Sequence, residues 1–186
     1  MNYFPLYLKL DNKKILIIGG GKIATDKLKK ILPFTSNITV VSNDFTQDME
    51  SLAKSNRVKL IKKKYKKGMI NQFDIVISAI DNITLQKEIF YESRDKNILV
   101  NSVDLQECCD FIFPSYIKEE ELIISISTSG ISPAIAKYLK RFIQKVLPKD
   151  LKDFLKEMKD LRNSLSKGKQ RMDILEKKAE EFFKKN

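Results

Sequence analysis

The chain has 186 residues, of which 42% are hydrophobic and 32% charged, enough for one full core and a small appended domain. No apolar run approaches the roughly 20 residues of a membrane-spanning helix, and the first ten residues do not resemble a signal peptide, so we expect a cytoplasmic protein. The chain contains no histidine, which effectively excludes a zinc site and a histidine-based triad, and we expect no metal site. Any acid-base catalysis must therefore use Asp, Glu, Lys, Tyr or Ser side chains.

The formal net charge is +11, and much of it lies near the C-terminus. Residues 137–186 contain sixteen Lys and Arg against eight Asp and Glu. Three explanations stay open: a solvated helical surface, attraction for a small ligand with several negative charges, and attraction for nucleic acid. The last is the weakest, because the tail has no aromatic stacking platform and no recognised nucleic-acid motif.

The first apolar run of the chain leads directly into three glycines. Before the run, residues 6–10 are expected to form an edge strand or a packed arm. Ile15 to Ile18 predict a strand, and an amphipathic helix follows until Pro33. Gly19, Gly21 and Ala24 have the spacing G-x-G-x-x-A, in which the second position lets a pyrophosphate approach the backbone. Such turns also occur for structural reasons alone, but the strand before and the helix after favour a dinucleotide site.

The second predicted strand, Ile38 to Val41, bears on the choice of cofactor. It leads into Ser42, Asn43 and Asp44. An NAD site usually places an acidic side chain on the ribose at this strand end, and here Asp44 comes a few residues late, so Asn43 or Ser42 is an alternative partner. No Arg stands there to bind a 2′-phosphate. We therefore expect NAD rather than NADP.

The elements that follow alternate between strand and helix, which predicts a Rossmann-like, doubly wound parallel sheet ending near Phe113. Ala79 and Asp81 lie at the end of one predicted strand and Asp104 at the end of another, so they should line the crevice where such sheets bind ligands. Asp104 is the candidate general base; its alternative role is a carboxylate that caps the next turn. The predicted elements are a helix over 46–55, strands over 58–61, 74–80 and 98–103, and a helix over 85–96 with Thr84 as N-cap.

The pattern changes after residue 113. Segments 111–117 and 122–128 are too close for a crossover helix and should pair antiparallel. Ser132 as N-cap and Pro133 at the first position predict a helix with one apolar stripe. Further helices are expected from Leu151 onward and, after Gly168, over 172–183. We divide the chain into an NAD-binding domain (1–113), a dimerisation and substrate region (114–147) and a C-terminal helical region (148–186).

Several motifs together resemble those of the precorrin-2 dehydrogenase and sirohydrochlorin ferrochelatase family of siroheme synthesis, including the N-terminal half of fused siroheme synthases. The resemblance covers residue 1 to about 147. The three motifs that begin at Asn101, Phe111 and Ser127 are far more specific than the glycine turn. The matching residues are Phe4-Pro5-Leu6, Gly19-Gly20-Gly21-Lys22-Ile23-Ala24 with Lys27, Ala79-Ile80-Asp81, Asn101-Ser102-Val103-Asp104, Phe111-Ile112-Phe113-Pro114 and Ser127-Thr128-Ser129-Gly130-Ile131-Ser132-Pro133.

The resemblance implies NAD-dependent oxidation of precorrin-2 to sirohydrochlorin, followed in some members by ferrous iron insertion, in a homodimer. It implies Asp104 as the catalytic carboxylate. The substrate carries eight carboxylates, which fits a basic protein surface. Two departures, at Leu105-Gln106 and Ser129-Gly130, bear on the shape of the substrate loops. The implied cofactor contacts are Gly21, Lys22, Ile23, Asn43, Asp44, Ala79 and Asp81, to which the glycine spacing adds Gly19. The expected substrate contacts are Ser127, Thr128 and Gly130.

Two other functions stay open. One is a non-catalytic NAD-sensing regulatory domain whose basic helical tail contacts a partner. The other is an unrelated small-molecule dehydrogenase on the same fold. Formation of NADH and sirohydrochlorin from precorrin-2 distinguishes the proposed enzyme from both.

Overall fold

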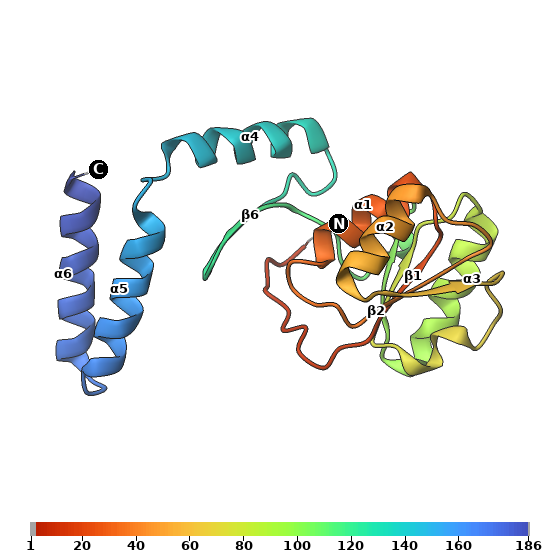
Figure 1. Cartoon of the computed structure of the whole chain (residues 1–186), viewed down its shortest axis with the longest axis horizontal. Helices are drawn as coiled ribbons and strands as arrows, with labels where there is room; N and C mark the ends of the chain where they lie inside the picture. Colours follow the sequence, from red (N-terminus) through yellow and green to blue (C-terminus); the bar gives the residue numbers. More distant parts are fainter. Residues whose placement is uncertain (1–2, 186) are drawn as a thin grey trace. The chain divides into compact units, whose positions relative to one another are not determined.

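The computed structural model describes residues 3–185, and the chain divides into two compact units between Ile112 and Phe113. Figure 1 shows the helices and strands of both units. The first unit contains β1 (Ile15–Ile18), α1 (Lys22–Ile31), β2 (Ile38–Ser42), α2 (Gln47–Asn56), β3 (Lys59–Lys62), η1 (Met69–Gln72), β4 (Ile75–Ser78), α3 (Ile83–Ser93), η2 (Arg94–Lys96), β5 (Leu99–Ser102) and η3 (Gln106–Cys108).

The five strands of the first unit form one parallel sheet in the order β3-β2-β1-β4-β5. Ile15 of β1 lies beside Ile38 of β2 on one side and Ile75 of β4 on the other. The strand order reverses between β1 and β4, which is where a doubly wound sheet opens a crevice at the carboxyl ends of its strands. The predicted doubly wound, Rossmann-like sheet is therefore confirmed.

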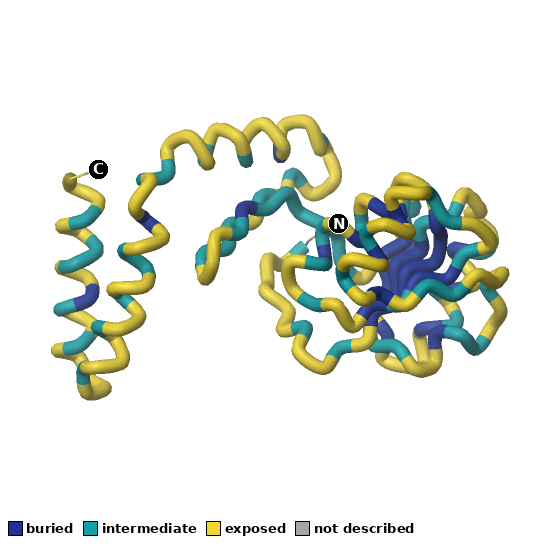
Figure 2. Tube along the Cα trace, viewed as in Figure 1, coloured by how far each residue is buried: buried dark blue, intermediate teal, exposed yellow. Residues whose placement is uncertain are grey.

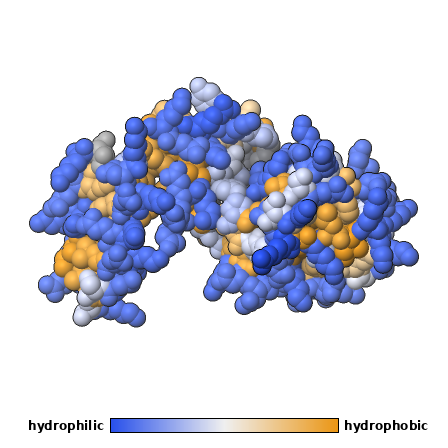
Figure 3. Space-filling view, viewed as in Figure 1, coloured by the Kyte–Doolittle hydropathy of each residue, from blue (hydrophilic) through white to orange (hydrophobic). Residues whose placement is uncertain are grey.

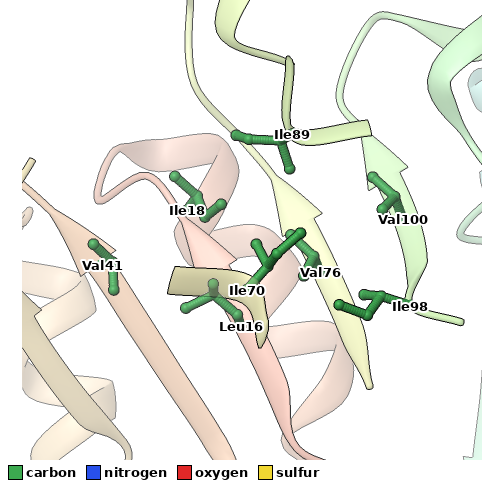
Figure 4. Packing of buried hydrophobic residues seen from close by; sticks show 8 residues of the cluster. All are labelled: Leu16, Ile18, Val41, Ile70, Val76, Ile89, Ile98 and Val100. Carbon is green, nitrogen blue, oxygen red and sulfur yellow. The ribbon is translucent and has the colours of Figure 1, made fainter. Parts of the chain in front are cut away.

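The strands are short apolar runs because helices cover both faces of the sheet (Figure 1). Figure 2 shows that the buried residues of this unit gather in its strands. Successive side chains of a strand point to opposite faces. Leu16 and Ile18 of β1 thus join Val76 of β4 in one cluster, which Ile70 and Ile89 cover from η1 and α3 (Figure 4).

Two details of the first unit differ from the prediction. Helix α3 begins at Ile83, and its N-cap is Asn82, whose side-chain oxygen accepts a hydrogen bond from Leu85 N at 2.9 Å. Thr84 lies inside the first turn, because the extended Asn82 follows the β4 end closely and starts the helix two residues earlier. Residues 6–10 form neither a strand nor a closely packed arm, since they have no strand partner and Leu6 is 67% exposed.

Close backbone packing, and not turn conformation alone, requires glycine at positions 19 and 20. A Cβ on Gly19 would lie 2.2 Å from the Ala79 carbonyl oxygen, and the φ of Gly19 is +121°. A Cβ on Gly20 would lie 2.0 Å from the Asp44 carbonyl oxygen. The turn therefore touches the chain that follows β4 on one side and the chain that follows β2 on the other.

The second unit consists of a β-hairpin and three helices. Its strands pair antiparallel, as predicted, with Ser115 opposite Ile126 and Glu119 opposite Leu122. Ser132 is the N-cap of the first helix and Pro133 is its first residue, also as predicted. The elements are β6 (Ser115–Glu119), β7 (Leu122–Ile126), α4 (Pro133–Val146), α5 (Leu151–Ser164) and α6 (Lys169–Lys185).

Helices α5 and α6 form a helical hairpin with few buried residues. The rings of Phe154 and Phe182 stack with their centroids 4.0 Å apart, and Lys178 pairs with Glu157. Gly168 precedes α6 with φ +153°, and α6 begins at Lys169, three residues earlier than predicted. The surface in Figure 3 is mainly hydrophilic, as expected for these lysine-rich helices.

We predict that Gly19→Ala destabilises the protein by about 2–6 kcal/mol, because positive φ and steric overlap each cost about 1–3 kcal/mol. Urea unfolding followed by circular dichroism measures this. Gly21→Ala is the matched control: a Cβ there meets nothing within 4 Å, so the expected cost is about 1 kcal/mol or less. Equal losses in the two variants would contradict the close approach at Gly19.

Candidate functional site

A crevice of about 250 Å³ lies at the carboxyl edge of the parallel sheet. It brings together three of the predicted cofactor residues, Gly19, Asn43 and Asp81, from the ends of β1, β2 and β4. These ends are adjacent because β1 lies between β2 and β4 in the sheet. The crevice thus occupies the position where open α/β sheets bind their ligands.

The local structure favours glycine at position 21 for a different reason than at Gly19 and Gly20. Its φ is −82°, which any residue adopts, and a Cβ there would meet no atom of the protein within 4 Å. The space above Gly21 is therefore open on the protein's side. A pyrophosphate pressed against this backbone fits the open space, and a side chain would fill it.

The start of α1 is built to face an anion. Gly21 is the N-cap, and no side chain caps the helix. The first backbone bond of the helix runs from Thr25 N to Gly21 O at 3.0 Å, so the preceding N–H groups have no partner within the helix. Lys22 and Ile23, both predicted cofactor contacts, are exposed at this end. The free N–H groups and the helix dipole favour a phosphate at this position.

The two residues that follow β2, Asn43 and Asp44, have different surroundings. Asn43 and Ser42 line the crevice. The Asp44 carboxylate instead pairs with Lys62 of β3 at 2.9 Å, and the Asp44 side chain is 82% exposed. The backbone carbonyl of Asp44 faces Gly20. Contacts of both residues with a cofactor stay predictions; of the two, only Asn43 lines the crevice.

The sequence reasoning missed three residues that follow β3. Lys63, Lys64 and Tyr65 line the same crevice. The Tyr65 hydroxyl donates to Glu92 Oε2 at 2.7 Å, and burial together with this carboxylate raises the pKa of Tyr65. Their position directly after a parallel strand was the signal that could have found them, because all carboxyl ends meet at one edge.

Asp104 lies in the turn that follows β5. The turn continues the sheet through a bond from Val103 N to Ser78 O at 2.9 Å, and Asp104 itself adopts the left-handed conformation at φ +59°. Within residues 3–185, the Asp104 side chain is exposed and accepts no hydrogen bond. The alternative role as a turn cap therefore has no support in this geometry.

The loop that carries Asp104 is held at its far end by Asp110. Arg94 donates to both carboxylate oxygens of Asp110, at 2.8 and 2.7 Å, and Val100 N donates to Oδ2 at 2.8 Å. Burial acts to raise the pKa of Asp110, but these hydrogen bonds outweigh it and lower that pKa. The Cys109 thiol donates to Ser102 O at 3.1 Å. The loop is thus fixed while the Asp104 carboxylate stays accessible.

The side chain of Lys27, from α1, reaches Asn101 near the end of β5. Its Nζ donates to Asn101 Oδ1 at 3.4 Å. Burial lowers the pKa of Lys27 to about 8. The sequence singled out Lys27 only as part of a family motif and assigned it no role.

The predicted substrate contacts lie in the second unit, in the turn before α4. Thr128 Oγ1 accepts a hydrogen bond from Ser132 N at 3.0 Å, and Ser127 Oγ accepts one from Ser129 N at 3.0 Å. Gly130 has φ +87°, which glycine adopts without strain. These residues shape the turn, and their contact with a substrate stays a prediction.

Two features are absent from residues 3–185, a metal-binding cluster and a membrane-spanning helix. No group of three or more His, Cys, Asp or Glu is arranged to hold a metal ion. No helix in this range is both long and apolar enough to span a membrane.

A family model described as "Putative NAD(P)-binding" matches residues 6–115, which is more than half of the chain. The chain belongs to this family. The matched region contains the glycine turn, the crevice and Asp104. The predicted nicotinamide dinucleotide cofactor agrees with the description of the family.

Curated relatives extend the likeness beyond this region. The siroheme synthase of Pseudoalteromonas translucida is 34% identical over 151 residues, which are 81% of this chain and 32% of that protein. The siroheme synthase of Buchnera aphidicola is 31% identical over 156 residues, 84% of this chain and 33% of that protein. The chain thus spans about a third of these relatives. They confirm the resemblance inferred from the motifs.

The chain is also similar to a solved structure described as "SirC, precorrin-2 dehydrogenase", with a TM-score of 0.78 and 22% sequence identity. The match covers 94% of this chain and 88% of that one. At this identity the match establishes the fold, including a β-rich and helical part after the parallel sheet.

We predict that Gly21→Asp lowers NAD affinity at least about a hundredfold, because its side chain and negative charge enter the phosphate space. Isothermal calorimetry measures the affinity, and the melting temperature checks that the protein stays folded. Ser51→Asp, which adds the same charge on the exposed face of α2, should bind NAD normally. Unchanged affinity in Gly21→Asp would rule out the phosphate position.

Proposed function

We propose that this protein is an NAD-dependent precorrin-2 dehydrogenase that produces sirohydrochlorin in siroheme biosynthesis. The observation that carries the proposal is the accessible Asp104 carboxylate on the same sheet edge as the open space at Gly21. Membership in the NAD(P)-binding family, siroheme synthase relatives and the fold of a precorrin-2 dehydrogenase support it.

The residues at the glycine turn and crevice would hold the dinucleotide. The backbone N–H groups at Gly21 to Ile23 bind the pyrophosphate, and Asn43 with Ser42 binds the ribose. NAD is favoured because these ribose partners are neutral and no Arg follows β2. Lys63 and Lys64 add positive charge to this crevice, so NAD and NADP are to be compared in one assay. When bound, the cofactor supplies an acceptor for hydride.

Asp104 would take the proton. Oxidation of precorrin-2 to sirohydrochlorin removes a hydride and a proton, so a base at the reacting edge lowers the barrier. The Asp104 carboxylate has the required acceptor oxygens, and no protein donor occupies them in the described structure. Asp81 follows β4 and lines the crevice, where it would contact the cofactor rather than the substrate.

We predict that Asp104→Asn lowers turnover by about 10²-fold or more, because the amide keeps the shape and removes the base. NADH absorbance and the sirohydrochlorin band measure turnover, and calorimetry should show unchanged NAD affinity. An Asn variant that oxidises precorrin-2 at the wild-type rate would exclude Asp104 as the base. The same assay with ferrous or cobaltous ion tests the metal insertion that the resemblance implies for some members.

We also propose that the protein is a homodimer through its second unit. Among the described residues after position 112, few apolar side chains are buried, and an isolated two-stranded hairpin is marginally stable in water. Helix α4 and the turn before it expose an apolar stripe, whose side chains are 41–87% exposed. A second copy would cover this stripe. The stripe consists of Ile131, Ile135, Tyr138, Leu139, Phe142 and Val146.

We predict that sedimentation detects a dimer at micromolar concentration and that Phe142→Asp shifts it toward monomer, since a charge would be buried in the interface. Tyr91→Asp is the matched control, because Tyr91 is a similarly exposed aromatic residue in the first unit. A wild-type monomer at micromolar concentration would refute the proposal.

The alternative of a non-catalytic NAD-sensing module has less support, because such a module needs no accessible carboxylate at Asp104. It predicts NAD binding without NADH formation from precorrin-2. A cytoplasmic location, expected from the composition, stays a prediction.

A further inference from the structure

The crevice is lined at the end of β2 by neutral side chains. Ser42 contributes a hydroxyl and Asn43 an amide, and both groups can donate hydrogen bonds as well as accept them. The acidic residue that follows, Asp44, pairs with Lys62 at 2.9 Å. A site selective for NAD usually places a carboxylate here, which bonds the ribose 2′-hydroxyl and repels a 2′-phosphate. Neither of the two lining side chains can repel a phosphate in this way.

The chain that leaves β3 lies against the same end of the crevice. Strand β3 pairs with β2, and Lys62 lies beside Ser42 in this pairing. The backbone N–H of Lys63 donates to Ser42 O at 2.9 Å, which continues the pairing one residue beyond the strand. Lys63 and Lys64 therefore line the crevice together with Ser42 and Asn43.

Glu92 of α3 fixes the loop that carries these lysines. Only 5% of the Glu92 side chain is exposed. Its Oε2 accepts a hydrogen bond from the Tyr65 hydroxyl at 2.7 Å, and its Oε1 accepts one from Gly68 N at 2.7 Å. Burial acts to raise the pKa of Glu92, but these bonds and Lys96 outweigh it and lower that pKa, so the carboxylate stays charged. The loop is thus held in place at Tyr65 and Gly68, which reduces the cost of ordering it around a ligand.

The positive charge of Lys63 and Lys64 is not used within the protein. Both side chains are exposed, and neither forms an ion pair within the part of the chain that the structure describes. Asp81 also lines the crevice, but it follows β4, and β1 lies between β4 and β2. Two adjacent ammonium groups without acidic partners suit a ligand group that carries about two negative charges, and lysine binds phosphate as a point charge.

We propose that Lys63 and Lys64 bind the 2′-phosphate of NADP, so that the crevice accepts NADP as well as NAD. The Ser42 hydroxyl and the Asn43 amide would donate to the same phosphate. The positive charge then comes from the end of β3, instead of from an arginine after β2. This inference rests on the dinucleotide site of the proposed function, but not on precorrin-2 as the substrate.

The test measures the binding of both dinucleotides by isothermal calorimetry. The wild type should bind NADP with an affinity within about tenfold of that for NAD, because no carboxylate repels the additional phosphate. The double variant Lys63→Gln with Lys64→Gln keeps two polar side chains and removes both charges. It should weaken NADP binding about tenfold, the combined effect of two exposed charge pairs, and NAD binding by about twofold at most.

The matched control is the double variant Lys66→Gln with Lys67→Gln. It removes two exposed lysines of the same loop that do not line the crevice. The net charge changes equally in the two double variants, so the control separates a local contact from long-range attraction. The control should bind both dinucleotides like the wild type, and melting temperatures check that both variants stay folded. Added salt should weaken the binding of NADP more than that of NAD in the wild type, and this difference should shrink without Lys63 and Lys64.

The inference would be overturned if the ratio of NADP to NAD affinity were the same in the wild type and in the variant without Lys63 and Lys64. An equal loss of NADP affinity in the control without Lys66 and Lys67 would also overturn it, and so would a wild type that binds NAD but not NADP. Failure of the proposed function is distinct, because then the protein binds the dinucleotides but forms neither NADH nor NADPH from precorrin-2.

Discussion

The first unit depends on how closely two loops approach the turn after β1. The carbonyl oxygens of Ala79 and Asp44 occupy the positions where Gly19 and Gly20 would carry a Cβ. Thr46 N also donates to Gly20 O at 3.0 Å, which ties the start of α2 to the same turn. Because the turn is held from both sides, the first residues of α1 project over the strand edge. The open space at Gly21 exists because its two neighbours are packed tightly.

This constraint explains which parts of the site the sequence could predict. The glycine spacing, the apolar strands and the small residues at strand ends are local patterns, and each maps directly onto the sheet. The spacing treats Gly20 as a variable position, although its contact with Asp44 O leaves no room for a side chain. The position of Lys63 and Lys64 after a strand placed them at the carboxyl edge of the sheet, but their distance from the turn also depends on the strand order β3-β2-β1, which the sequence pattern does not give.

Lys27 shows a second limit of the sequence. Along α1 it is one of several lysines on a polar face, and its spacing gives no reason to separate it from Lys29 or Lys30. Its burial comes from β5 and the loop that Asp110 fixes, some 70–85 residues later in the chain. Lysine is a common residue type on a helix surface, and what sets Lys27 apart is its partial burial at the carboxyl edge of the sheet. Asp104 was easier to find, because it follows a predicted strand and so lies at the edge where such sheets bind ligands.

The charge of the second unit has a structural component that composition alone does not reveal. The acidic hairpin turn at Glu120 and Glu121 pairs with Lys152 and Lys159 of α5, so part of the excess of lysines joins the hairpin to the helical hairpin. These pairs are exposed and stabilise little, but they connect α5 to the turn of the hairpin. Lysines used in this way are not arranged to follow a phosphate backbone. These pairs favour a solvated helical surface over a nucleic-acid site, and the choice among the three explanations of the tail, which include a small ligand with several negative charges, stays a prediction.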